Sequence, residues 1–277
     1  MIGVANWPII VSRRLQGRPS GASQSLHRAL PGIRKVPAIG VYFWIIKLLS
    51  TAQGEVTSDY FVRQINPVIA VGLGGLGLLA ALILQFSARR YVPWIYWLAV
   101  VMVAVFGTMV ADVIHVRFGI PYLVSTASFL VTLAVIFVAW YASEKTLSIH
   151  TIYTRRREMF YWATVMATFA LGTAAGDLTA ITWHLGYFSS GVLFAVLIAV
   201  PALAYQLFNV NPIVAFWLAY ILTRPLGATF ADWFGRSRNL SGLGLGTGLV
   251  SLVLTIVIVI LVAYLTLTRG DVEGEEA

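Results

Sequence analysis

The chain alternates between long apolar stretches and short polar segments along almost its whole length. Apolar stretches of about 17 to 25 residues are typical of helices that span a membrane. The pattern predicts eight such helices, near residues 38–62, 66–86, 93–116, 119–141, 160–183, 187–206, 213–234 and 245–267. These ranges leave almost no residues for a soluble domain. The predicted fold is therefore all-α, a polytopic membrane helical bundle with eight spans.

The composition agrees with this prediction. Of the 277 residues, 59% are hydrophobic and 11% are charged, and the mean hydropathy is +0.83. Soluble domains contain about 45–50% apolar and about 25% charged residues. We therefore expect the lipid bilayer to be the main surrounding of the chain. The chain contains no cysteine, which excludes disulfides, thiolate metal sites and cysteine nucleophiles.

Basic residues account for the formal net charge of +8, and they gather on one side of the predicted bundle. Twelve lie before the first span or after the second and fourth spans: Arg13, Arg14, Arg18, Arg28, Arg34, Lys35, Arg89, Arg90, Lys145, Arg155, Arg156 and Arg157. The opposite side has only Arg63, Arg117, Arg236 and Arg238. The positive-inside rule then predicts that both termini are cytoplasmic. The same rule explains the net charge without a nucleic-acid partner.

The two ends of the chain differ in charge from the membrane domain, which we assign to residues 35–268. Residues 1–34 are basic and contain no Asp or Glu. We interpret them as a disordered cytoplasmic leader, and an organelle transit peptide is the alternative that this composition leaves open. Residues 269–277 form an acidic tail, which we interpret as a solvated cytoplasmic end.

An internal repeat divides the membrane domain into four units, at about residues 35–88, 89–145, 155–208 and 209–268. Each unit contains a tryptophan fifteen residues before an aspartate, and a glycine five residues before it. The tryptophans are Trp44, Trp97, Trp162 and Trp217; the glycines are Gly54, Gly107, Gly172 and Gly227; the aspartates are Asp59, Asp112, Asp177 and Asp232. Because each unit has two spans, every unit enters the membrane from the same side, so the repeats are parallel.

This pattern resembles a bacterial family of integral membrane proteins of unknown function, defined by four tandem repeats with two spans and a characteristic tryptophan each. The stretches that carry the resemblance are KVPAIGVYFWIIKLLSTAQGEVTSD, LSIHTIYTRRREMFYW and LTRPLGATFAD. It covers residues 35 to about 265. The resemblance implies a multi-pass protein of the bacterial inner membrane, and it implies no established activity.

Charged residues inside the predicted spans are the strongest functional signal. There are five acids and two bases: Glu55, Asp59, Asp112, Asp177, Asp232, Lys47 and Arg224. Each charge at the centre of a membrane helix costs about 2.5–3.5 kcal/mol, so such residues are candidates for function. When all seven are ionised their net charge is −3, which favours binding of a cation or of protons.

These charges predict a membrane protein that transports a cation, either a divalent metal ion or protons. The four repeat aspartates would bind the cargo, Glu55 would carry a proton, and Lys47 and Arg224 would act as counterions or as a gate. His115 and His184 lie near two of the aspartates and are candidate ligands if the cargo is a divalent metal ion, because imidazole with carboxylate suits Mn²⁺, Fe²⁺ or Zn²⁺. A histidine at the membrane interface is the simpler interpretation of both residues.

Two other interpretations concern the same residues. The charges could pair between spans and stabilise the bundle of a non-transport protein, such as a sensor or an assembly partner. The four glycines could allow close helix packing, or could mark a local helix break that frees carbonyl groups. No nucleophile or metalloprotease motif occurs in the chain, so we do not expect an enzyme. The sequence implies no resident cofactor and leaves the oligomeric state open.

Overall fold

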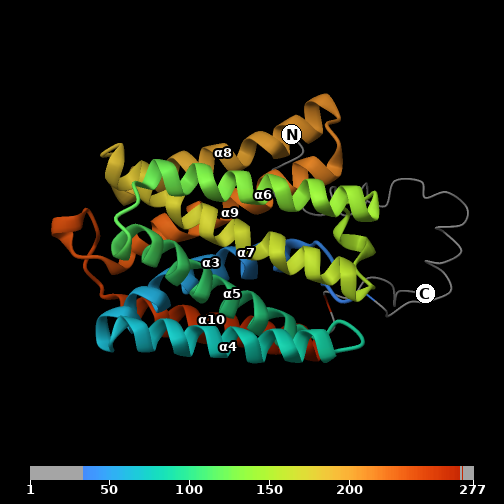
Figure 1. Ribbon diagram of the computed structural model, residues 1–277, viewed down its shortest axis with the longest axis horizontal. Coiled ribbons are helices and arrows are strands. Elements are labelled where there is room, and N and C mark those ends of the chain that lie inside the picture. The colour runs from blue at the N-terminus through green and yellow to red at the C-terminus, as the bar shows by residue number, and fades with distance from the viewer. Residues whose placement is uncertain (1–33, 269, 271–277) are drawn as a thin grey trace, which may run out of the picture.

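The computed structural model describes residues 34–268 and 270, and this part of the chain contains helices and no strands. The predicted leader and the predicted tail lie almost entirely outside the described residues. Within the described part, eight long α-helices form one elongated bundle (Figure 1). Seven of them are long and apolar enough to cross a membrane, as expected of a membrane protein. The helix outside this set is α3 (Val41–Gln64), which contains Lys47, Glu55 and Asp59.

The helices form an inner layer and an outer layer. The inner helices are α3, α5 (Pro93–Asp112), α7 (Arg155–Asp177) and α9 (Pro212–Gly235). The outer helices are α4 (Pro67–Ser87), α6 (Tyr122–Glu144), α8 (Gly186–Phe208) and α10 (Thr247–Thr268). In the most apolar stretches of α5, α7 and α9, 56–83% of the residues are buried. In those of the outer helices the share is only 17–28%. The outer helices therefore present most of their apolar surface to the surroundings of the bundle.

Side-chain caps mark the starts of α4, α7 and α9. Asn66 and Asn211 each accept a hydrogen bond from the backbone two residues later, and the proline that follows each of them opens α4 or α9. In the same way the Thr154 hydroxyl caps α7, accepting a hydrogen bond from the Arg157 backbone. α7 therefore begins at Arg155, earlier than the predicted position near residue 160, because its first turn carries the basic residues that the prediction assigned to a loop.

The inner helices form a closed ring in the order α3, α5, α7, α9 and back to α3. Each outer helix packs chiefly against the inner helix of the next pair: α4 against α5, α6 against α7, and α8 against α9. The last outer helix, α10, packs against α3 and so closes the cycle. The helix pairs thus interlock around the ring.

All four inner helices begin at the same end of the bundle, which we call the tryptophan end; the opposite end is the aspartate end. A buried ion pair stabilises the tryptophan end, where the Lys35 ammonium lies 2.6 Å from the Glu158 carboxylate. Gln85 donates a second hydrogen bond to Glu158, over 3.0 Å. The segment before α3, the end of α4 and the start of α7 are therefore held together at this end.

Candidate functional site

Five sets of equivalent side chains are buried inside the inner ring, and each set takes one residue from each inner helix. Successive sets are four residues apart, so they follow one face of each helix. From the tryptophan end to the aspartate end they are Phe43, Tyr96, Tyr161 and Phe216; Lys47, Val100, Val165 and Tyr220; Thr51, Ala104, Phe169 and Arg224; Glu55, Thr108, Thr173 and Ala228; Asp59, Asp112, Asp177 and Asp232. Asp112 is half-buried and all the others are buried.

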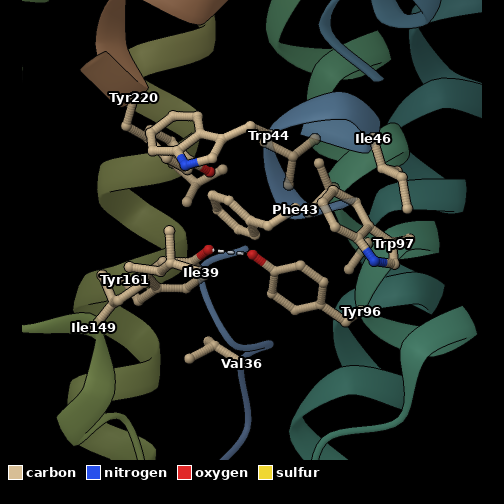
Figure 2. Packing of buried hydrophobic residues seen from close by; sticks show 14 of the residues in the cluster. Val36, Ile39, Phe43, Trp44, Ile46, Tyr96, Trp97, Ile149, Tyr161 and Tyr220 are labelled. Atoms are coloured by element: carbon tan, nitrogen blue, oxygen red, sulfur yellow. Dashed lines mark hydrogen bonds between the residues drawn. The ribbon is translucent and has the colours of Figure 1, made fainter. Parts of the chain in front are cut away.

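The first set and the four repeat tryptophans form an aromatic collar at the tryptophan end. Each aromatic residue of the set contacts the tryptophan of the next inner helix, and the cycle closes. The ring centroids lie 5.9 Å apart for Phe43–Trp97, 5.6 Å for Tyr96–Trp162, 6.3 Å for Tyr161–Trp217 and 5.7 Å for Phe216–Trp44. Figure 2 shows Phe43 among Trp44, Trp97 and Tyr220, close to the hydrogen bond between the Tyr96 and Tyr161 hydroxyls. Aromatic side chains therefore fill the space between the four inner helices at this end.

Lys47 lies next to the collar and is enclosed by aromatic faces. Its side chain is 1% exposed, and its ammonium nitrogen lies 3.9 Å from the centre of the Phe169 ring and 4.1 Å from that of Tyr220. The nitrogen has no hydrogen-bond partner within the described residues. The Lys47 ammonium group therefore contacts the faces of two aromatic rings, which attract cations, in place of a carboxylate.

Arg224 connects all four inner helices. Its Nη2 donates hydrogen bonds to Glu55 Oε2 and Thr173 Oγ1, both at 2.7 Å, and to Thr108 Oγ1. Its Nη1 donates to the Thr51 carbonyl oxygen at 3.1 Å. Glu55, Thr108 and Thr173 occupy the same repeat position, so three equivalent oxygens meet at one nitrogen. Glu55, the ion-pair partner of Arg224, lies between Lys47 and Asp59 on the same face of α3.

At the aspartate end, two of the four aspartates are paired with arginines. Asp59 lies 2.9 Å from Arg63 and 3.3 Å from Arg236, and Asp232 lies 2.8 Å from Arg236. Each arginine stands four residues after an aspartate, a spacing that is readable from the sequence. Sequence reasoning used both arginines only as markers of topology. Counting both arginines with the seven predicted charges changes the net charge from −3 to −1, although Arg63 is half-exposed and only Arg236 is largely buried.

Asp112 and Asp177 differ from the other two aspartates. Neither has a basic nitrogen within 4 Å in the part of the chain that the structure describes. Each is followed directly by a π-helical turn, Val113–Arg117 after Asp112 and Leu178–Thr182 after Asp177. Such turns occur frequently at functional sites. The two middle helix pairs therefore carry carboxylates that have no basic partner among the described residues and that lie next to irregular backbone.

The two candidate histidines have different surroundings. His115 Nδ1 is 2.7 Å from the Ile120 carbonyl oxygen, and its ring stacks on Tyr122. His184 is exposed, in the turn between the second π-helical segment and α8, with a left-handed φ of 56°. Across residues 34–268 and 270, no three His, Asp or Glu side chains form a group that could hold a metal ion.

The four repeat glycines lie where adjacent inner helices approach each other. A methyl group added at each would come within 2.3 Å of Ala104 for Gly54, 2.9 Å of Phe169 for Gly107, 2.3 Å of Arg224 for Gly172 and 1.9 Å of Thr51 for Gly227. Each partner belongs to the third buried set and to the next inner helix. All four glycines lie within continuous α-helices, so the alternative of a local helix break is wrong. Their absent side chains permit close packing.

Comparison with known proteins gives one family. A model described as a Repeat of Unknown Function (DUF347) matches residues 95–146, 160–210 and 215–271. These segments make up more than half of the chain. The chain belongs to this family. No curated protein and no solved structure matches the chain.

The three DUF347 repeats coincide with the helix pairs α5–α6, α7–α8 and α9–α10. The α3–α4 pair is outside the matched segments, yet it occupies the remaining position in the ring and has Gly54 and Asp59 at the repeat positions. It is also the pair that carries Lys47 and Glu55. With Asp59, the pair outside the DUF347 match thus contributes three of the charges buried in the ring.

Proposed function

We propose that this DUF347-repeat protein transports a cation through a site inside its inner ring. The observation that carries the proposal is the run of charged and polar side chains from Lys47 through Arg224 and Glu55 to the four aspartates. Charges inside a membrane helix are costly, so such residues are functional candidates. Asp112 and Asp177, which have no basic partner within the described residues, are the carboxylates that are available to a cation.

In this proposal the α3–α4 pair is a fourth, divergent repeat, and the protein spans the membrane eight times. Ring closure by α10 against α3 supports this assignment. α3 can cross the membrane with a polar stripe because its stripe faces the other inner helices rather than lipid. We also propose a bacterial inner membrane and cytoplasmic termini. The basic residues in the loops at the tryptophan end support that orientation.

The proposed mechanism is competition for Glu55. The aromatic collar closes the cytoplasmic end in this conformation, so cargo would arrive at or leave from Asp112 and Asp177 at the other end. To move further it must displace Arg224, which lies 2.7 Å from Glu55. A proton on Glu55 would release Arg224 in the same way. Lys47 and Arg224 are then the charges that occupy the ring when cargo is absent, and the cargo is a divalent metal ion or protons.

One observation favours a second candidate function. Arg224 contacts all three other inner helices, and nearly every residue of the five sets is buried. The charges would then stabilise the ring of a sensor or an assembly partner that transports nothing. Asp112→Asn separates the two functions, since it removes a charge that has no ion pair within the described residues.

The test is the elemental content of cells that express the wild-type protein, in media supplemented with Mn, Fe, Zn, Co, Ni or Mg, measured by mass spectrometry. We expect one metal to change selectively, and the change to disappear in Asp112→Asn and Asp177→Asn. Asp271→Asn, in the acidic tail, is the matched control and should behave as wild type. If the cellular content of no metal changes at equal expression, the proposal that the cargo is a divalent metal ion is wrong. Proton movement into proteoliposomes, followed with a pH-sensitive dye, then tests the other version.

A further inference from the structure

The oxygens around Arg224 form a cage that suits a cation other than a guanidinium. Three oxygens meet at Nη2: Glu55 Oε2, Thr108 Oγ1 and Thr173 Oγ1. A guanidinium nitrogen of this kind carries only two hydrogens, so three acceptors exceed its donors. Meanwhile Nε of Arg224, which is buried, has no hydrogen-bond partner in residues 34–268 and 270. Arg224 therefore leaves its own donors and the acceptors of the cage imperfectly matched.

The two hydroxyls of this oxygen cage turn their lone pairs towards its centre. The Thr108 hydroxyl donates its hydrogen to the Ala104 carbonyl oxygen at 2.9 Å. The Thr173 hydroxyl donates to the Phe169 carbonyl oxygen at 3.2 Å. Since each hydroxyl has one hydrogen, both act only as acceptors towards Nη2. The cage thus offers three converging oxygen acceptors from α3, α5 and α7, all of them buried.

The charge and the walls of the oxygen cage indicate which cation it would bind. Two neutral hydroxyls and one carboxylate supply a single negative charge, which balances one positive charge. Divalent cations in proteins are bound through more oxygens, often with several carboxylates or retained waters. The Phe169 ring, which faces both Lys47 and Arg224, adds a surface that attracts cations.

We infer that the oxygen cage of Glu55, Thr108 and Thr173 is a binding site for a compact monovalent cation, an ammonium or alkali-metal ion, which it binds when Arg224 withdraws. This inference rests on the proposed cation transport, and it assigns the cargo to the monovalent cations in place of the divalent metal ion or protons of that proposal. Arg224 holds the site in the closed state, and the cation replaces its Nη2.

The first test is the thermal unfolding of the purified full-length protein in detergent, with chloride salts of NH₄⁺, K⁺, Na⁺, Mg²⁺, Mn²⁺ and choline at equal ionic strength. Arg224→Met removes the guanidinium and leaves the oxygen cage intact. We expect one or more of the compact monovalent ions to raise its Tm saturably, by about 3 °C or more. The same salts should leave wild type unchanged. The rise should be lost in Arg224→Met combined with Thr108→Val.

Comparison of the NH₄⁺, K⁺ and Na⁺ series identifies which compact ion the oxygen cage prefers. A rise with Mg²⁺ or Mn²⁺ alone, a rise of equal size with choline, or no rise with any salt would overturn the inference.

A second test does not depend on the folding of Arg224→Met. Proteoliposomes that contain wild type should show uptake of NH₄⁺, K⁺ or Na⁺, and Thr173→Val should reduce it about tenfold or more. Thr168→Val, a buried threonine of α7 outside the oxygen cage, is the matched control and should retain the uptake. Proton or Mn²⁺ flux that depends on Asp112 without any monovalent uptake refutes this inference and keeps the proposed transport. No flux of any cation refutes both.

Discussion

The two ends of the inner ring are built on the same repeat positions, but they use them differently. At the tryptophan end all four units keep an aromatic pair, and each pair contacts the next around the whole ring. At the aspartate end all four units keep a carboxylate, yet among the described residues only Asp59 and Asp232 are paired with arginines. The collar is aromatic in all four units, whereas the carboxylates at the other end differ in their partners.

This difference indicates which part of the repeat stabilises the fold and which part is free to carry function. The aromatic collar and the repeat glycines keep the four-fold packing, because a change in any one unit would disturb its neighbour. The charged positions have diverged: Glu55, Thr108, Thr173 and Ala228 are equivalent in the ring and differ in chemistry. Substitutions at the collar should therefore cost the most stability, and substitutions at the unpaired aspartates the least.

Trp97→Ala should destabilise the protein most, by about 3–5 kcal/mol, because it leaves a cavity within the aromatic collar. Trp97 is 1% exposed, whereas Trp94, one turn earlier on α5, is 49% exposed. Trp94→Ala is therefore the matched control, and it should cost much less. Equilibrium unfolding in detergent measures both. Equal losses for the two variants would mean that the collar does not close the ring as described.

Arg224→Met should cost about 3 kcal/mol or more in choline buffer, since it leaves the Glu55 carboxylate buried without its partner. Combining it with Glu55→Gln removes that unpaired charge and should restore much of the stability. Unfolding of the single and double variants measures the coupling between the two residues. Additive losses would contradict the buried ion pair.

Gly54→Ala should cost about 1–3 kcal/mol, because the added methyl group would lie 2.3 Å from Ala104 on α5. Gly72→Ala is the matched control on α4, where an added methyl group would meet nothing within 4 Å. That control should be neutral or stabilising, since alanine favours helix more than glycine does. Unfolding midpoints of the two variants give the comparison. A neutral Gly54→Ala would show that the inner helices are not in close contact there.

Asp112→Asn should change stability by only about 0.5 kcal/mol, because Asp112 has no ion pair within the described residues. Asp232→Asn should cost about 1.5–3 kcal/mol, because it weakens the charge-assisted hydrogen bond from Arg236. Cation flux should nevertheless be lost in Asp112→Asn. A large loss of stability in Asp112→Asn would assign this carboxylate to the fold instead.

Much of the fold was predictable because it depends on local pattern. Hydrophobic stretches predicted eight helices close to those observed, and the spacing of tryptophan, glycine and aspartate aligned the inner helices. The interlocking of each outer helix with the next pair was not predictable, because the apolar faces of α4, α6, α8 and α10 are alike and do not specify a partner. The first turn of α7 was not predicted because its three consecutive arginines are typical of a polar loop between membrane helices.

The residues of the candidate site were predictable, but their partners were not. Charges in apolar helices are conspicuous, so Lys47, Glu55 and Arg224 stood out. The contacts of Arg224 with Thr108 and Thr173 could be seen only once the order of the inner helices was known. A neutral threonine in an apolar helix does not by itself indicate a charged partner. Arg236 stands four residues after Asp232, but its contact with Asp59 joins the last helix pair to the first. The π-helical turns left no mark in the sequence pattern.

The most direct test of the proposed transport is the electric current across the membrane of proteoliposomes that contain only this protein, measured when a cation gradient is applied. We predict a saturable current with wild type, its loss in Asp112→Asn and Asp177→Asn, and its retention in Asp271→Asn, with all proteins folded. The absence of current for protons, monovalent ions and divalent ions alike would contradict transport. The buried charges would then serve to hold the ring together.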